Sequence, residues 1–177
     1  MAKKTNPQKV VSNVVQAILD PHNPQDDRSA AIMACAILES ELGRAILMRL
    51  REMNVEEQNR LLDNNGHGAI ATLSAKIWVG FAIGLYKEQA REDLLTLKNI
   101  RNDFAHVGDH IDFSSVDIIK ACNTLVYPKL NAESIMKPEI TDPKERYLDT
   151  ICHLAAGFNL YAGQNACRPP APQFISY

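Results

Sequence analysis

Apolar residues recur every three or four positions along most of this chain, which is the spacing of one face of an α-helix. The pattern predicts helices over residues 8–19, 26–53, 54–64, 69–86, 88–106, 115–127 and 144–162. No alternation of apolar and polar residues is long enough to indicate a β-strand. We therefore expect an all-α protein, built as a single-domain bundle of about five to seven helices.

Prolines divide the chain into three parts. Pro21 and Pro24 end the first helical pattern, because proline cannot continue a helix. The last ten residues are rich in proline, which is typical of extended chain, and Phe174, Ile175 and Tyr177 are available there for a groove on a partner. We expect an N-terminal arm with a short helix over residues 1–25, a helical domain over 26–163 and an extended tail over 164–177.

The longest helical pattern begins at Asp26 and Asp27, whose carboxylates suit the positive end of a helix dipole. Its first half is rich in alanine, which would let another helix approach closely. The apolar face that this pattern predicts consists of Ile32, Cys35, Ala36, Leu38, Leu42, Ile46, Leu47 and Leu50.

The most apolar stretch spans residues 69–86 and contains one lysine, Lys76. A charge inside the stretch favours a central buried helix over a membrane span. Gly80 and Gly84 then indicate a close helix crossing. A lysine on a buried helix either extends its ammonium to the surface or pairs with a charge, and Glu39 is a possible partner.

Composition limits the possible functions. The 177 residues are 46% hydrophobic and 23% charged, with a net charge of −2, which argues against sequence-specific binding of duplex DNA. The basic N-terminus has no apolar run beside it, so it does not indicate a secretory signal. Four cysteines without Cys-x2-Cys spacing indicate reduced thiols in a cytoplasmic protein. We expect no metal site, no cofactor and no membrane segment.

Candidate chemistry is concentrated in residues 98–106, at the end of one amphipathic helix. Leu94, Leu97, Ile100 and Phe104 form the predicted core stripe of this helix. We expect the helix to stop at Gly108, which places His106 in the last turn. Lys98, Arg101, Asn102 and His106 lie off the core stripe and can face a cleft or a partner.

Three of these side chains could together cleave RNA without a metal. Arg101 offers a cationic fork for phosphate oxygens, Asn102 can orient a neighbour and His106 can exchange a proton near neutral pH. Lys98 and Lys76 are candidate substrate-binding cations. The alternative is structural, with His106 and Arg101 serving as a helix cap and a surface ion pair, for example with Asp103 or Asp109.

The sequence Arg101-Asn102-Asp103-Phe104-Ala105-His106 resembles the Arg-x4-6-His signature of the HEPN superfamily. The resemblance implies a HEPN-like helical fold and a metal-independent endoribonuclease. Two further stretches fit the bare spacing, from Arg60 to His67 and from Arg146 to His153. The first crosses a turn and the second lacks the polar residue after arginine, so we expect neither to be the site, and we expect His153 to be a packed or surface histidine.

Five segments, in the same order, resemble the mannitol operon repressor family across about residues 26–125. That resemblance implies an all-helical protein linked to transcriptional control, which can act through protein partners. The segments are Asp27-Arg28-Ser29-Ala30-Ala31-Ile32, residues 36–42, residues 68–77, Ala82-Ile83-Gly84-Leu85 and Ile100-Arg101-Asn102-Asp103-Phe104-Ala105-His106.

Two functional hypotheses follow. The first is a metal-independent endoribonuclease that acts on RNA through Arg101, Asn102 and His106. The alternative is a non-catalytic regulator of the mannitol-repressor type that acts by protein contact. We also expect a homodimer with residues 88–106 near its axis, because cyclising RNA cleavage uses an acid and a base while one chain supplies a single histidine here.

Overall fold

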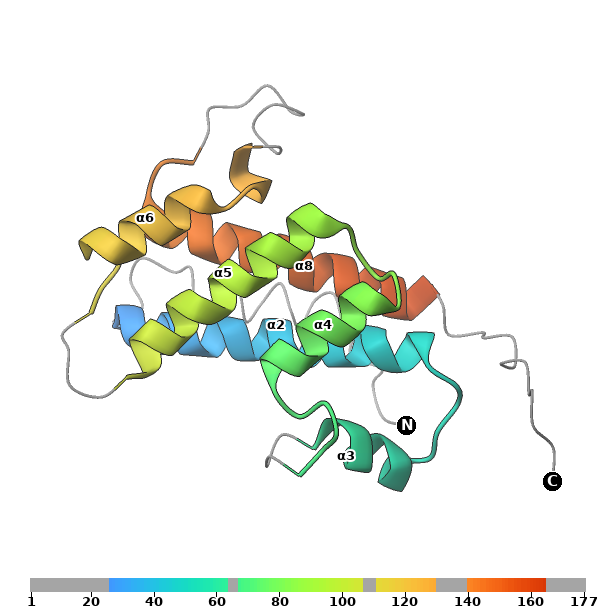
Figure 1. Ribbon diagram of the computed structural model, residues 1–177. Helices are drawn as coiled ribbons and strands as arrows, with labels where there is room; N and C mark the ends of the chain where they lie inside the picture. The colour runs from blue at the N-terminus through green and yellow to red at the C-terminus, as the bar shows by residue number, and fades with distance from the viewer. Residues whose placement is uncertain (1–25, 64–66, 107–110, 130–139, 165–177) are drawn as a thin grey trace, which may run out of the picture.

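The computed structural model describes residues 26–63, 67–106, 111–129 and 140–164. Its helices are α2 (Asp27–Arg49), α3 (Val55–Leu62), α4 (Leu73–Ala82), α5 (Glu88–Ala105), α6 (Val116–Thr124) and α8 (Pro143–Gln164), as Figure 1 shows. No strand occurs in these four ranges, so the all-α prediction is confirmed. The helix predicted over residues 8–19 and the tail after residue 164 lie outside the described residues.

The two longest helices, α2 and α8, lie side by side and run in the same direction (Figure 1). Lys144 pairs with Asp27 near their start, and the Tyr147 hydroxyl donates to the Ala31 carbonyl at 3.0 Å. Nearer their ends, the Asn159 amide donates to Glu41 at 3.0 Å. The buried alanines at the start of α2 allow this approach, as the sequence predicted: Ala30, Ala31 and Ala34.

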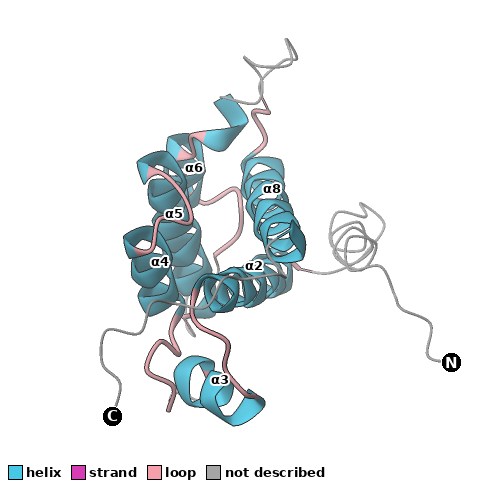
Figure 2. Ribbon diagram, turned by 90° about the vertical axis from the view of Figure 1, so that its right-hand side faces the viewer, coloured by secondary structure: helices cyan, strands magenta, loops and turns pink. Residues whose placement is uncertain are grey.

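Helices α4, α5 and α6 form a second layer against α2 and α8 (Figure 2). Helix α5 contacts α2, α4, α6 and α8, so its apolar stripe lies at the centre of the core. Leu94, Leu97, Ile100 and Phe104 are all buried, as their spacing predicted. Helix α3 lies below these layers, and none of its residues is fully buried.

Helix α4 is shorter than the predicted stretch 69–86 because both ends carry local stop signals. The Thr72 hydroxyl accepts the Ala75 N–H at 3.1 Å and caps the start. Gly84 has φ +72°, a left-handed conformation that suits glycine and ends the helical path. No described helix is long and apolar enough to cross a membrane.

The prediction that Gly80 lies at a close crossing with another helix was wrong. A Cβ at Gly80 would lie 2.8 Å from the Tyr86 hydroxyl, so this glycine makes room for a side chain of the α4–α5 loop and not for another helix. The Tyr86 hydroxyl donates to the Ile77 carbonyl at 2.6 Å, which fixes the ring on α4. At Gly84 nothing lies within 4 Å, and its role is the turn.

Helix α6 begins at Val116, and the hydroxyl of its N-cap residue Ser115 makes no capping hydrogen bond. The Asp112 carboxylate accepts hydrogen bonds from both Ser114 and Ser115 hydroxyls, at 2.7 and 3.0 Å. These hydrogen bonds hold together the turn just before α6.

Candidate functional site

The candidate site lies where α5 ends. Ring packing holds this end in place, because Phe104 contacts Phe113 with ring centroids 4.8 Å apart. Contrary to the prediction, His106 is not part of the last helical turn: it is the C-cap residue, with φ −64° and ψ 129°. Its backbone N–H still donates to the Asn102 carbonyl at 3.1 Å. The imidazole is exposed and makes no hydrogen bond within the described residues.

Arg101 and Asn102 are joined directly, since the Arg101 guanidinium donates to the Asn102 amide oxygen at 3.0 Å. Both side chains are half-buried. Arg101 lies on the flank of α5 that faces α2: burial raises the pKa of the Cys35 thiol to about 12, and the positive charge of Arg101 opposes that rise. The structure therefore places two of the three predicted site residues in contact, with Arg101 on the α2 side.

No ion pair joins Arg101 to Asp103 among the described residues, and Asp109 lies outside them. The surface ion pair of the structural alternative is therefore absent at Asp103. The cap role is present in part, because the His106 backbone, and not its imidazole, closes the helix.

Arg28, on α2, is the residue that sequence reasoning missed. Its guanidinium Nη2 donates to the carbonyl oxygens of Ala105 and His106, each at 3.1 Å. The last carbonyls of a helix lack helical partners and carry its negative dipole end, so a cation is favourable there. Arg28 belongs to the first segment of the family resemblance, but nothing in its local pattern shows that it reaches α5.

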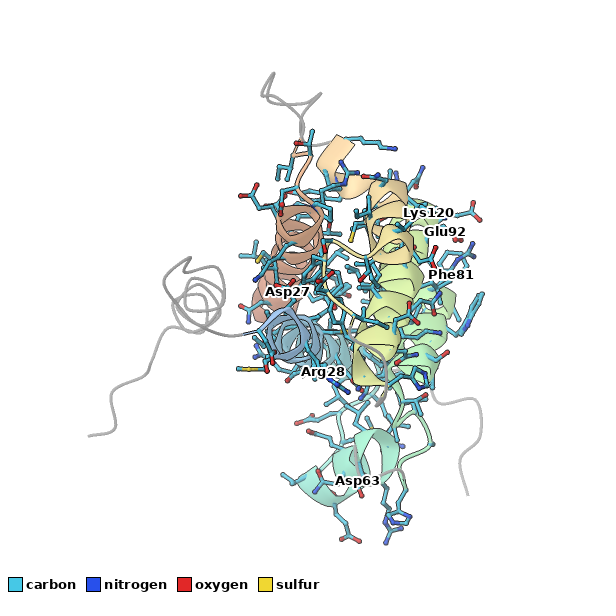
Figure 3. The ribbon with its side chains drawn as sticks, turned by 90° about the vertical axis from the view of Figure 1, so that its left-hand side faces the viewer. Asp27, Arg28, Asp63, Phe81, Glu92 and Lys120 are labelled. Atoms are coloured by element: carbon cyan, nitrogen blue, oxygen red, sulfur yellow. The ribbon has the colours of Figure 1, made fainter. Side chains whose placement is uncertain are left out.

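The neighbouring Asp27 ties two more segments to the same end of α2. Its carboxylate accepts the Phe113 N–H at 3.1 Å and pairs with the Lys144 ammonium at 2.8 Å. Figure 3 shows Asp27 and Arg28 pointing in different directions from α2, which lets them hold different neighbours. The end of α5 is thus anchored to α2, while the loop before α6 is anchored beside it.

The two predicted substrate-binding lysines have different environments. Lys98 is half-buried on α5, one turn before Arg101 and Asn102, and forms no ion pair with a described residue. Lys76 is only 2% exposed, and its ammonium contacts Glu39 at 2.7 Å and the Ala71 carbonyl at 3.0 Å. The pairing with Glu39 that the sequence suggested is confirmed. Binding of a substrate by Lys76 stays a prediction, and it would require this ion pair to open.

The other two Arg-to-His stretches have structural roles. Arg146 is buried and donates to the carbonyls of Cys122, Leu125 and Ile140. His153, seven residues further on, is exposed and stacks on Tyr127 with ring centroids 3.7 Å apart, which agrees with the expectation of a packed or surface histidine.

In the first stretch, Arg60 pairs with Glu56 at 2.7 Å on exposed α3, which leaves its guanidinium engaged. His67 is exposed. The partners of Arg60 and Arg146 are thus a carboxylate and backbone carbonyls.

The site can offer positive charge and one exposed imidazole. Among the described residues, no group of three or more His, Cys, Asp or Glu side chains could hold a metal ion. Arg28, Lys98 and Arg101 have no carboxylate within ion-pair distance in the part of the chain that the structure describes. An anionic group of a ligand or partner is therefore the chemistry that this end of α5 suits best.

Comparison with known proteins adds one finding. No family model and no curated protein matches the chain. Among solved structures it is similar to MtlR in the X-ray structure of the MtlR–HPr complex from Escherichia coli, with 18% sequence identity and a TM-score of 0.63. The similarity covers 85% of this chain and 99% of that one. The chain therefore has an MtlR-like all-α fold.

Proposed function

We propose that this chain is a non-catalytic regulatory module that acts by binding another protein. The observation that carries the proposal is the fold, which is shared along 99% of an MtlR chain found in a complex with HPr. HPr is accordingly the first partner to test.

The geometry at the end of α5 supports binding over cleavage by a single chain. General acid and base catalysis needs two proton-transfer groups within hydrogen-bond reach of the reacting atoms. His106 is exposed, and no second imidazole or carboxylate hydrogen-bonds to it among the described residues. Arg28, Lys98 and Arg101, which form no ion pair with a described carboxylate, are in turn suited to holding an anionic surface.

Isothermal titration calorimetry with purified HPr tests the proposal. We expect saturable binding with a dissociation constant in the micromolar range, as is common for transient regulatory contacts. A small globular protein matched to HPr in size and net charge is the control, and it should give no binding heat. Absence of HPr binding at concentrations far above micromolar, together with RNA cleavage by the same preparation, would refute the protein-contact function.

A metal-independent endoribonuclease is the second candidate. It is favoured by one observation, the contact between Arg101 and Asn102 beside an exposed His106. In this reaction the ribose 2′-oxygen loses its proton to a base and attacks phosphorus, and the bond to the 5′-oxygen breaks as that oxygen gains a proton. His106 would transfer one proton, Arg101 would stabilise the phosphoryl charge and a second copy of the chain would supply the other histidine.

His106→Ala separates the two candidates. If His106 transfers a proton, the substitution should lower the cleavage rate of single-stranded RNA by roughly 10² to 10⁴-fold. Arg101→Lys should restore little activity, because an ammonium lacks the guanidinium fork. His153→Ala is the matched control and should cleave like the wild type, and EDTA should not inhibit. No cleavage by the wild type, or full cleavage by His106→Ala, would eliminate the nuclease.

A further inference from the structure

We infer that Arg28, Lys98 and Arg101, together called the basic face, form a docking site for a carboxylate-rich surface of a partner protein. The inference rests on the proposed protein-binding function and goes further by naming the surface and the chemistry of the partner.

The three cations are brought together by helix geometry and one tertiary contact. Lys98 and Arg101 are three residues apart on α5, and Ala105 follows four residues later, so they share one flank. Arg28 reaches the end of the same helix from α2, since its guanidinium bonds to the Ala105 and His106 carbonyls. The segment from Lys98 to Ala105 extends about 10 Å along the helix, a span that several carboxylates of one partner could contact.

No described carboxylate lies within ion-pair distance of the basic face. The Asp26 carboxylate accepts the Ser29 N–H at 2.6 Å, and the positive charge of Arg28 helps to lower its pKa, while Asp27 pairs with Lys144. Asp103 is two residues beyond Arg101 and therefore about 200° further round α5, on another side of the helix.

The buried thiol beside Arg101 does not supply a negative charge either. Burial raises the pKa of Cys35 to about 12, so it stays neutral near pH 7. Its neutrality leaves the charge of Arg101 uncompensated, in agreement with the lack of any described ion pair.

Both arginines are also held in fixed orientations. Arg28 is fixed by the Ala105 and His106 carbonyls, and Arg101 by the Asn102 amide. A guanidinium that is already ordered loses less conformational freedom when a carboxylate binds, which favours association.

Charge elsewhere on the chain favours protein over RNA as the occupant. Single-stranded RNA is commonly held by aromatic rings on which bases stack, beside cations that track the phosphates. Here the rings of Trp78 and Phe81 contact Arg91, but Glu88 and Glu92 pair with that arginine. With a net charge of −2 for the chain, a local carboxylate surface is a better match than a long polyanion.

Calorimetric titration of charge variants with HPr tests the inference. Lys98→Glu should weaken HPr binding about tenfold or more, and wild-type affinity should fall steeply as salt is raised. Lys120→Glu is the matched control: Lys120 lies on α6, well apart from Arg28 in Figure 3, and it should bind HPr like the wild type. Circular dichroism checks that each variant is folded, and the milder Lys98→Gln should show a smaller loss.

The outcomes separate the two proposals. If HPr binds the wild type and Lys98→Glu equally, the protein-binding function stands and the basic face is refuted as its docking site. If HPr does not bind at all, fluorescence anisotropy at low salt with a labelled polyglutamate peptide and a labelled single-stranded RNA decides. Binding of the peptide by wild type but not by Lys98→Glu supports the basic face. Binding of RNA alone, or of neither probe, overturns the inference.

Discussion

Replacing Lys76 with methionine should destabilise the fold by about 3 kcal/mol, because it leaves the Glu39 carboxylate without its cation. The Lys76 ammonium lies 2.7 Å from Glu39 and 3.0 Å from the Ala71 carbonyl, and the side chain is 2% exposed. Methionine retains most of the buried aliphatic stem. The substitution therefore removes charge and hydrogen bonds while leaving no large cavity.

The magnitude follows from the burial of the two partners. Removing one member of a fully buried ion pair costs about 3–5 kcal/mol. The Glu39 side chain is 16% exposed, so water can partly solvate it and the cost should be near the lower limit. For a chain of this length, that loss lowers the midpoint of thermal unfolding by roughly 6–12 °C.

Urea unfolding followed by far-UV circular dichroism measures the effect, and the fluorescence of Trp78, the one tryptophan of the sequence, gives a second signal. Lys120→Met is the control. Its pair with Asp117 is largely exposed, so it should cost less than about 0.5 kcal/mol.

Adding Glu39→Gln to Lys76→Met should recover most of the lost stability, because no unpaired buried charge then remains. A cost below about 1 kcal/mol for Lys76→Met alone, or a double variant as unstable as the sum of the two single variants, would refute the reasoning.

Three further predictions concern packing, pH and assembly. Gly80→Ala should cost about 1–3 kcal/mol in urea unfolding because its Cβ would meet the Tyr86 hydroxyl, whereas Gly157→Ala, with nothing within 4 Å, should be neutral or stabilise α8. Burial raises the pKa of Asp149, and its Oδ2 has no hydrogen-bond partner among the described residues. The folded protein therefore holds this proton more tightly than the unfolded chain, so Asp149 stabilises the fold at low pH and this stabilisation is lost as pH rises through the raised pKa. Asp149→Asn should therefore raise the free energy of unfolding at pH 7 by about 1 kcal/mol and flatten its pH dependence, and an unchanged pH profile would contradict this. Light scattering at micromolar concentration should detect a dimer near twice 19.7 kDa if two copies complete a nuclease site, and a monomer at every concentration would argue against that site.

Helix type and position could be read from the sequence because they depend on local spacing. The core stripe of α5 is an example, since residues three and four apart must share a face wherever the helix packs. The start of α3 is likewise set by nearby residues, because Asn54 and Glu57 form a capping box there. The pattern placed Ala36 on the apolar face of α2, but this residue is exposed. Spacing identifies the residues at the centre of an apolar face better than those at its edges.

The candidate site was predictable only in part. Sequence spacing singled out Arg101, Asn102 and His106 as candidates and predicted that His153 is a packed or surface histidine, and the exposed His153 stacks on Tyr127. It also suggested Glu39 for Lys76, because a buried ammonium requires an opposite charge. It could not reveal Arg28, whose contact with the His106 carbonyl joins residues 78 positions apart.

The sequence by itself thus determines which segments are helical and which of their residues form apolar stripes, because both depend on neighbouring residues. Composition determines that the chain has no overall basic charge. The tertiary structure decides that α2 and α8 run parallel, that Arg28 bonds to the end of α5 and that no described carboxylate forms an ion pair with the basic face. Each of these requires side chains from distant segments to meet, and whether a cation finds a carboxylate or a carbonyl is decided by which helices pack together.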